Sequence, residues 1–270
     1  MRILQLLLVV IIISCNANSD NDTKNINDNK VENKIKQIEV RTSNIRILNK
    51  IPHDPMAYTQ GLVYHKGFLY ESTGHRGASS LRKIDPKTGE ILKKASVPGR
   101  FFSEGICIYE DLIYMITWTS GKCFVYNIDS FEMIKEMNYN GEGWGLANYG
   151  KKLLMSDGSN VLRVIDPNNF LVEKNISVVD KNYNPISYLN EMENINGEIW
   201  VNIWMQDKIA RINAETGTLI GWVDITSIRE FVENRTQEVS NGIAYNKENE
   251  IIYLTGKNWE YIFVVQLVEL

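Results

Sequence analysis

The sequence predicts an all-β fold: a five-bladed β-propeller with four antiparallel strands in each blade. From residue 40 onward, an apolar strand, a short polar turn and a second apolar strand recur five times, about 40 to 51 residues apart, which is the period of a propeller. A single strand at the front, residues 40–51, supplies the strand that the last unit lacks. Closing the ring in this way leaves no long sheet edge exposed.

The elements follow in a regular order. The first hairpin of each unit begins in turn at Gly61, Gly105, Gly145, Glu191 and Gly242. A second hairpin follows in the first four units, with turns at Asp85, Asn127, Asp166 and Asn213. The fifth unit adds only a third strand, YIFVVQLVEL, and we expect residues 40–51 to pair with it as its outer strand. Residues 228–238 form the one segment that is plausible as a helix.

Residues 1–15 are typical of a lipoprotein signal peptide. An apolar run, ILQLLLVVIIIS, follows Arg2 and is too short to span a bilayer. It ends in Ile12-Ile13-Ser14-Cys15, a loose match to a bacterial lipobox in which Cys15 would carry the lipid. An ordinary secretory signal, cleaved at residues 17–19, is the alternative. Either signal predicts export to the periplasm or to the cell surface.

Residues 16–39 are dominated by Asn, Asp and Lys and contain no aromatic residue. Such a segment cannot bury enough apolar surface to offset the entropy lost on ordering. We therefore expect a flexible tether, followed by a catalytic propeller domain over residues 40–270. The lipid at Cys15 would be the only attachment to the membrane, and we expect the domain to be a monomer.

Composition excludes several functions. The net charge of −4 and the lack of a polybasic stretch argue against nucleic acid as a partner. His53, His65 and His75 fall in a loop, a turn and a blade-edge loop without ligand spacing, so we expect no metal site and no cofactor. Cys107 and Cys123 fall on the first and third strands of one blade, too far apart for a disulfide, and are expected to be buried apolar residues.

One mouth of the propeller carries most of the polar and aromatic side chains. The first strand of each blade lines the axis and the second runs back beside it, so the start of one and the end of the other meet at one mouth. The residues at these positions are Tyr58, Gln60, Ser72, Thr73, Phe102, Glu104, Thr117, Trp118, Glu142, Trp144, Ser156, Asp157, Asn190, Asn202, Trp204, Asn241, Thr255 and Lys257. The opposite strand ends carry ordinary turn residues.

This set of residues predicts a site for a small ligand. Packing and turn capping explain any single position, but polar groups removed from water cost free energy unless they are partnered. A concave apolar site with a few convergent polar groups is the usual form of a ligand pocket. No serine lies in a nucleophile elbow. The remaining chemistry is acid/base catalysis by Glu104, which stands in the stretch FFSEGI, with Lys257 and side-chain amides as donors.

Eight motifs then carry a resemblance to a known family. They are PHDPMAYTQGL, LYESTG, FFSEGI, EGWGL, MSDGS, LNEME, NGIAY and TGKNW, in this order from residue 51 to residue 263. They resemble the motifs of the plant-type and bacterial glutaminyl cyclases, the glutamine cyclotransferase family. The resemblance implies a five-bladed propeller and a metal-independent transferase that converts amino-terminal glutamine of peptides or proteins to pyroglutamate with release of ammonia.

The resemblance also implies roles for single residues. Glu104 matches the catalytic acid/base of the family, and we expect Lys257 and Asn190 to stabilise the oxyanion. The matching substrate-binding positions are Gln60, Phe102, Trp118, Trp144 and Trp204. Two positions depart from the family pattern. Ser103 replaces a glycine and is expected to crowd the substrate or to add a hydrogen bond, and Tyr58 replaces a phenylalanine, adding a hydroxyl at the pocket rim.

Two other functions remain open. A calcium-dependent propeller hydrolase would take oxygen ligands from Glu104, Asn190, Asn241 and Asp157, although Lys257 at the same mouth is a poor neighbour for a divalent cation. A non-catalytic, exported binding module would retain peptides without releasing ammonia.

Overall fold

The repeated apolar segments form strands throughout the domain. The structure is a computed structural model, which describes residues 40–232 and 239–268, and in these residues it has twenty strands and one short 3-10 helix. The all-β prediction is confirmed. The predicted signal peptide with Cys15 and the predicted tether lie outside the described residues, as do residues 233–238 of the predicted helix. The described part of that segment is a 3-10 turn, Thr226–Phe231.

Three sheets have four antiparallel strands each, in sequence order. The first contains β2 (Thr59–His65), β3 (Phe68–Thr73), β4 (Ser80–Ile84) and β5 (Ile91–Ser96). The second contains β6 (Ser103–Tyr109), β7 (Leu112–Thr117), β8 (Lys122–Asn127) and β9 (Met133–Asn138). The third contains β10 (Leu146–Tyr149), β11 (Lys152–Met155), β12 (Val161–Ile165) and β13 (Val172–Ser177).

The fourth sheet has eight strands. Its order is β14 (Leu189–Ile195), β15 (Glu198–Ile203), β16 (Lys208–Asn213), β17 (Leu219–Asp224), β1 (Arg41–Pro52), β20 (Tyr261–Val268), β19 (Ile251–Gly256) and β18 (Ser240–Asn246). The front strand β1 pairs antiparallel with β20, as the sequence predicts. It also pairs in parallel with β17, from Arg41 opposite Gly221 to Asn44 opposite Asp224. This second pairing was not predicted, and it joins two groups of four strands into one sheet.

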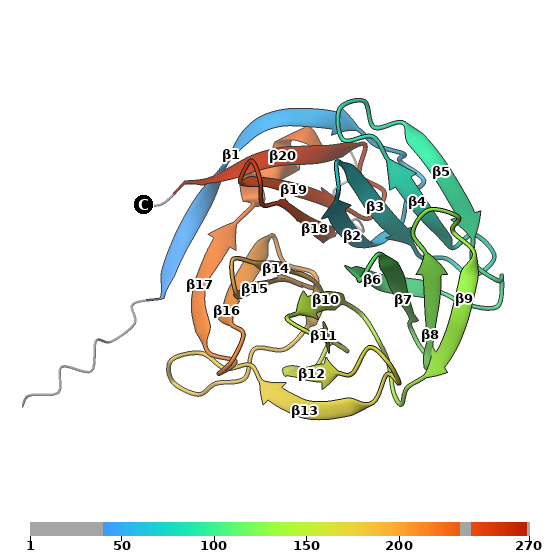
Figure 1. Cartoon of the computed structure of the whole chain (residues 1–270). Helices are drawn as coiled ribbons and strands as arrows, with labels where there is room; N and C mark the ends of the chain where they lie inside the picture. Colours follow the sequence, from blue (N-terminus) through green and yellow to red (C-terminus); the bar gives the residue numbers. More distant parts are fainter. Residues whose placement is uncertain (1–39, 233–238, 269–270) are drawn as a thin grey trace, which may run out of the picture. The chain divides into compact units, whose positions relative to one another are not determined.

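The first strands of the units lie together at the centre of the domain. Figure 1 shows β2, β6, β10, β14 and β18 innermost, with β5, β9, β13, β17 and β1 toward the outside. Each innermost strand contacts the next, and β18 contacts β2, which completes a ring of contacts. The core lies between neighbouring sheets, where Leu81 and Tyr70 pack with Phe124 and Met115 of the next one. These faces are apolar because each sheet is covered on both sides.

Three glycines allow the innermost strands to approach at backbone distance. A Cβ atom added to Gly61 or Gly105 would lie 2.6 Å from a backbone nitrogen of the next strand. At Gly145 the added Cβ would lie 2.1 Å from the carbonyl oxygen of Asn190. These contacts leave no room for any side chain, and we refer to Gly61, Gly105 and Gly145 as the axial glycines.

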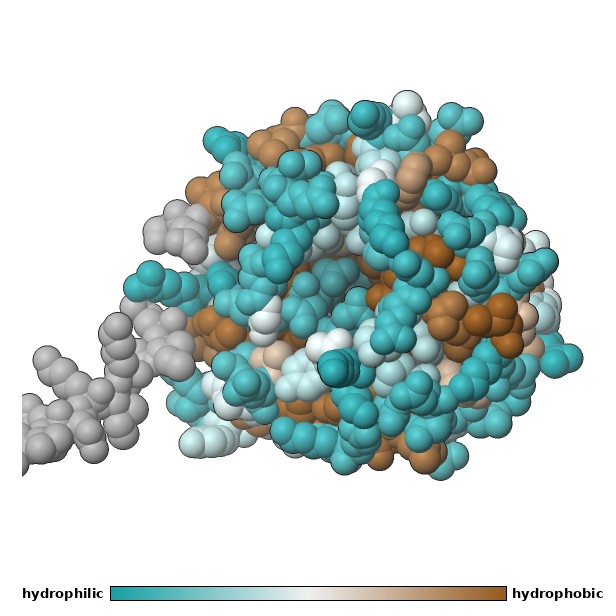
Figure 2. Space-filling view, viewed as in Figure 1, coloured by the Kyte–Doolittle hydropathy of each residue, from teal (hydrophilic) through white to brown (hydrophobic). Residues whose placement is uncertain are grey.

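The last features of the fold are its buried cysteines and its surface. Cys107 and Cys123 are buried and are not joined in a disulfide, as predicted. The face seen in Figure 2 is mostly hydrophilic and is hollowed at its centre. Among the described residues no helix is long and apolar enough to cross a membrane.

Candidate active site

Four of the five innermost strands begin with an irregularity of the β-bulge kind at a polar residue predicted for the site. The register of strand pairing shifts beside Gln60 in β2, Glu104 in β6, Asn190 in β14 and Asn241 in β18. A bulge inserts an extra residue and re-aims a side chain, and bulges are common beside active sites. Side chains along a regular strand point alternately to the two faces of the sheet. We interpret the irregularity as the feature that re-aims these polar side chains at the start of each strand.

One cavity of about 400 Å³ is lined by all the residues predicted to be catalytic or substrate-binding, although not by every residue expected at this mouth. Its lining is Tyr58, Gln60, His75, Phe102, Glu104, Trp118, Trp144, Asn190, Trp204 and Lys257. The polar groups lie deep, since Glu104 and Lys257 are each 6% exposed and Gln60 and Asn190 are each 2% exposed. Trp118 and Trp204 are each 39% exposed and stand at the opening. The cavity thus combines an aromatic rim with a floor that carries one carboxylate, one amine and two amides.

Two serines anchor the floor from neighbouring strands. Ser72 Oγ, at the end of β3, donates to the carbonyl oxygen of Glu104 at 2.6 Å. Ser156 Oγ, at the equivalent position in the third unit, donates to the carbonyl oxygen of Asn190 at 2.8 Å. Both serines were among the residues expected at the mouth. The structure instead buries them, and they fix the backbone of a floor residue in the following unit.

Gln60 is oriented by a buried amide. Asn241 Nδ2 donates to Gln60 Oε1 at 3.0 Å and to the carbonyl oxygen of Thr59 at 3.0 Å. Because Gln60 Oε1 accepts this bond, the orientation of the Gln60 amide is fixed. Its NH₂ group is then the end that can donate to other partners. Asn241 itself is fully buried behind the floor. It acts on the site through Gln60.

The carboxylate and the amine of the floor shift each other's titration. Burial raises the pKa of Glu104 well above its ordinary value of 4.5, against the opposing charge of Lys257, and the charge of Glu142 raises it further. Burial also lowers the pKa of Lys257, which the charge of Glu104 partly offsets. Burial and then the charge of Glu104 raise the pKa of Tyr58. A carboxyl with a raised pKa can exchange a proton with an amine at little cost, as acid/base catalysis requires.

The aromatic wall is held by ring contacts and by one carboxylate. Glu142 Oε2 accepts hydrogen bonds from Trp118 Nε1 at 2.8 Å and from Trp144 Nε1 at 3.0 Å. Trp144 packs edge to face against Trp204, with ring centroids 5.8 Å apart. Phe102 packs against Trp118 in the same manner at 5.7 Å. Because one carboxylate joins two indoles, the wall is fixed in position before a ligand enters.

The structure changes the interpretation of Ser103 and His75. Ser103 is fully buried, and its Oγ donates to the carbonyl oxygen of Thr73 at 2.7 Å. Of the two expectations for Ser103, the structure agrees with an added hydrogen bond and not with crowding of the substrate, because the hydroxyl bonds the neighbouring strand β3 and does not line the cavity. His75 lines the opening, with its ring centroid 4.5 Å from that of Tyr58. The sequence analysis missed it, although it follows directly after the strand that ends at Thr73.

An all-β scaffold with a buried carboxylate and amine at the floor of an aromatic-walled cavity has the form of an enzyme site for a small ligand. Comparisons with known proteins agree with this class. The family model described as glutamine cyclotransferase matches residues 14–267. A curated protein of Arabidopsis thaliana, glutaminyl-peptide cyclotransferase, is 34% identical over 232 residues, which is 84% of this chain and 72% of that protein.

A solved structure is also similar. The crystal structure of Myxococcus xanthus glutaminyl cyclase matches with a TM-score of 0.81 and 32% sequence identity, over 86% of this chain and 100% of that one. The chain belongs to the glutamine cyclotransferase family. The resemblance found in the eight motifs is thereby confirmed.

Proposed function

We propose that this protein is a glutaminyl-peptide cyclotransferase in which Glu104 carries the proton. Family membership supports the reaction, the conversion of an amino-terminal glutaminyl residue to pyroglutamyl with release of ammonia. The observation that carries the catalytic role is the position of Glu104, buried on the floor of the aromatic-walled cavity beside Lys257.

The reaction needs one proton to move between two nitrogens of the substrate. The α-amine attacks the γ-carboxamide carbon, so a new N–C bond forms, and the old C–N bond of the amide then breaks. The amine gives up a proton and the leaving NH₂ group takes one, so ammonia departs and the atoms balance. A single carboxylate within reach of both nitrogens can act first as base and then as acid. Its raised pKa moves toward that of an α-amine, about 7.7 to 8.0.

The other floor residues would stabilise and orient the reacting groups. Lys257 and Asn190 are placed to donate to the tetrahedral oxyanion, and such donors contribute about 3 to 4 kcal/mol each in well-studied enzymes. Gln60, held by Asn241, would donate from its NH₂ group to the substrate. Phe102, Trp118, Trp144 and Trp204 would enclose the glutamine side chain and hold it near the ring geometry. The reaction is already intramolecular, so this enclosure adds orientation.

The direct test is ammonia release from a peptide that begins with glutamine. The domain of residues 40–270 is incubated with the peptide and a chelator, and an acetylated peptide serves as the blocked control. We expect release from the first peptide alone, with a mass loss that matches ammonia. Peptide binding without release would establish the binding module instead. Loss of turnover with chelator, restored by calcium, would establish the hydrolase-like metal site.

The pH profile of kcat offers a second test, because substitutions at Lys257 and at Glu142 should shift its acidic limb in opposite directions. Glu104 must be ionised to accept a proton, so kcat falls as the pH drops through its pKa, and we expect this limb well above pH 4.5. Lys257 lowers that pKa and Glu142 raises it. Lys257→Met should therefore move the limb to higher pH, and Glu142→Gln should move it to lower pH. The measurement is kcat between pH 4 and pH 9; limbs that move in the same direction would contradict the role of Glu104.

Calcium binding is the less favoured alternative at this mouth. The carboxylate of Asp157, one of the four ligands considered, is paired with Arg163 and accepts a bond from the Ser159 hydroxyl. Within residues 40–232 and 239–268, no group of three His, Cys, Asp or Glu side chains is placed to hold a metal ion.

The eight-stranded sheet is best interpreted as two blades, which makes five in total. The parallel pairing of β1 with β17 covers four residues, whereas its antiparallel pairing with β20 runs along the strand from Asn44 to Pro52. The ring of five innermost strands in contact supports the same count. In this interpretation β1 is the outer strand of the last blade.

The amino-terminal sequence supports export. Cys15 would be acylated after cleavage of the signal peptide, and residues 16–39 would tether the propeller to a membrane at the periplasmic or outer surface. Labelling of cells with a radioactive fatty acid should mark the wild-type protein and leave Cys15→Ser unlabelled. Equal labelling of both proteins, or none in either, would refute acylation at Cys15.

A further inference from the structure

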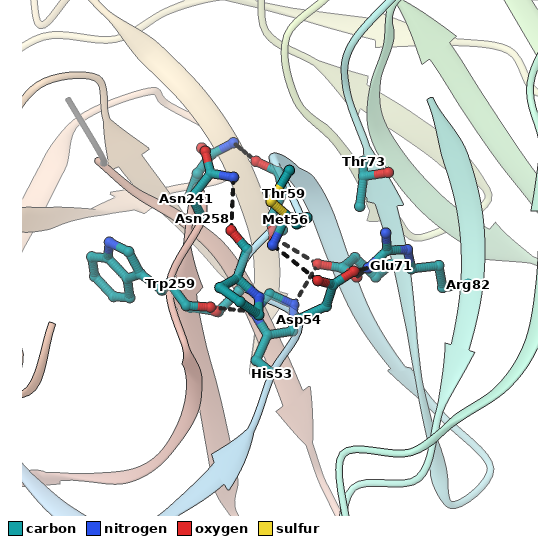
Figure 3. Close-up of polar contacts among 12 residues, drawn as sticks. His53, Asp54, Met56, Thr59, Glu71, Thr73, Arg82, Asn241, Asn258 and Trp259 are labelled. Atoms are coloured by element: carbon teal, nitrogen blue, oxygen red, sulfur yellow. Dashed lines mark hydrogen bonds and ion pairs between the residues drawn. The ribbon is translucent and has the colours of Figure 1, made fainter. Parts of the chain in front are cut away.

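A buried ionic cluster lies behind the candidate site. His53 Nε2 lies 2.8 Å from Glu71 Oε1, and the two side chains are 2% and 0% exposed. Thr59 Oγ1 donates to the same carboxylate oxygen at 2.6 Å. Arg82 Nη1 lies 3.5 Å from Glu71 Oε2 and 3.0 Å from Asp54 Oδ2. Figure 3 shows these side chains converging between β3, β4 and the segment that follows β1.

The geometry fixes the protonation of His53. Its Nδ1 lies 2.8 Å from the carbonyl oxygen of Trp259, which can only accept a hydrogen bond, and its Nε2 faces a carboxylate. With Glu71 ionised, as its lowered pKa indicates, both ring nitrogens donate, which is the imidazolium form. Burial alone would lower the pKa of His53, but Glu71 outweighs it and the pKa is raised. Burial likewise opposes ionisation of Glu71, but His53 and then Arg82 lower its pKa.

The cluster joins the chain segments that carry the floor residues. Trp259 follows Lys257 by two residues, so the bond from His53 Nδ1 to its carbonyl oxygen holds the turn of Lys257. Glu71 precedes Ser72, whose hydroxyl holds the backbone of Glu104. The His53–Glu71 ion pair thus connects the turn that carries Lys257 with strand β3, which supports the backbone of Glu104.

A second set of bonds fastens the same turn to the segment before β2. The backbone nitrogen of His53 donates to the carbonyl oxygen of Glu260 at 2.8 Å. The backbone nitrogen of Asn258 donates to Ala57 at 2.8 Å, and its side chain donates to Pro55 at 3.0 Å. This segment leads into Tyr58, whose ring centroid lies 4.9 Å from Lys257 Nζ.

We propose that the His53–Glu71 ion pair is a positioning unit that sets Lys257 relative to Glu104. This inference rests on the proposed function, because it assigns the pair a purpose in the same proton transfer. Neither residue lines the cavity or touches the substrate. A displacement of about 1 Å in a reacting group can lower a rate about 10²-fold, so a pair outside the cavity can control turnover.

The test compares variants that keep shape and remove charge. His53→Gln and Glu71→Gln each break the pair, and we expect kcat to fall between about tenfold and 10²-fold with a smaller change in KM. With Lys257 displaced, its charge no longer lowers the pKa of Glu104. The acidic limb of the kcat profile should therefore move to higher pH, in the same direction as for Lys257→Met. A role in stability alone would not move this limb.

His65→Gln is the matched control. His65 Nε2 pairs with Asp111 at 2.9 Å on an exposed turn, so this variant also removes a histidine–carboxylate pair. We expect it to leave kcat and the limb unchanged. If His53→Gln or Glu71→Gln does not fold, Thr59→Val removes one donor to Glu71 and provides the milder test, with a smaller change in the same direction.

The outcomes separate the inference from the function. If the wild type turns over and the variants lose melting temperature while kcat and the limb stay unchanged in the folded fraction, the pair is structural only and the inference is overturned. If the wild type shows no turnover, the proposed function fails. The inference is then tested by crystal structures of the wild type and of His53→Gln. It requires the turn that carries Lys257 to be displaced in the variant, and an unmoved turn would refute it.

Discussion

Glu104→Gln is expected to abolish measurable cyclisation while the domain stays folded. The amide keeps the shape of the side chain but cannot accept the amine proton, and loss of a general acid/base lowers rates by about 10²- to 10⁴-fold. Folding should be unharmed, since burial raises the pKa of Glu104 and the charged form is therefore the costly one. Ammonia release at saturating peptide and the melting temperature are the two measurements.

A second acid, half-buried and with a raised pKa, provides the control for this variant. Desolvation raises the pKa of Glu193 to about 8, and Glu193 follows the floor residue Asn190 in the same strand β14. Glu193→Gln should leave kcat near the wild-type value, since this side chain does not line the cavity. Full activity in Glu104→Gln would exclude the proposed mechanism, and equal losses in both variants would show a general effect of removing a carboxyl whose pKa is raised.

Gly145→Ala is expected to cause a large loss of stability. The added Cβ would lie 2.1 Å from the carbonyl oxygen of Asn190 and 2.9 Å from its carbonyl carbon, and backbone atoms cannot move aside as a side chain can. Overpacking commonly costs about 1 to 3 kcal/mol and more where the backbone must shift. At about 3 kcal/mol the melting temperature of a domain this size falls by about 6 to 12 °C. Turnover should fall too, because Asn190 is on the floor.

Gly99→Ala is the matched control for that substitution. Its added Cβ would come no closer than 3.5 Å to a neighbour, an ordinary contact, so both melting temperature and kcat should remain near those of the wild type. A melting temperature for Gly145→Ala equal to that of Gly99→Ala would mean that the innermost strands separate easily, contrary to the backbone contacts.

Much of the fold could be predicted because local signals repeat. Each hairpin carries its own turn residues and its own apolar alternation, so the pattern recurs and the missing strand of the last unit stands out. The parallel pairing of β1 with β17 has no such signal. It depends on how the first described strand lies against a segment far along the chain, which only the assembled domain determines. The hydrogen-bonded sheets therefore number fewer than the repeated units.

The residues that line the site could be predicted better than the residues that hold them in place. The positions of residues at the strand ends near the axis correctly predicted that Glu104, Lys257 and the aromatic wall line one cavity. The same reasoning could not separate lining residues from anchors, and so it placed Ser72 at the mouth. A hydroxyl beside a bulge either faces the cavity or bonds a neighbouring carbonyl, and the choice depends on distances between strands. His53 lies in a loop, as predicted, but its burial and its pairing with Glu71 were not predicted, because the partner stands 18 residues further on in strand β3.

The pairing of β1 with β20 has a consequence for how the protein is made. The bond between Arg46 and Gln266 joins residues 220 positions apart, so β1, the first strand of the domain to be synthesised, must wait for β20, the last. Contacts of such long sequence separation form late and slowly. Lys257 lies just before β20, so the catalytic floor is incomplete until that final strand docks. From the proposed function we therefore expect a chain that still lacks β20 to be inactive, and activity to begin once β1 and β20 have paired.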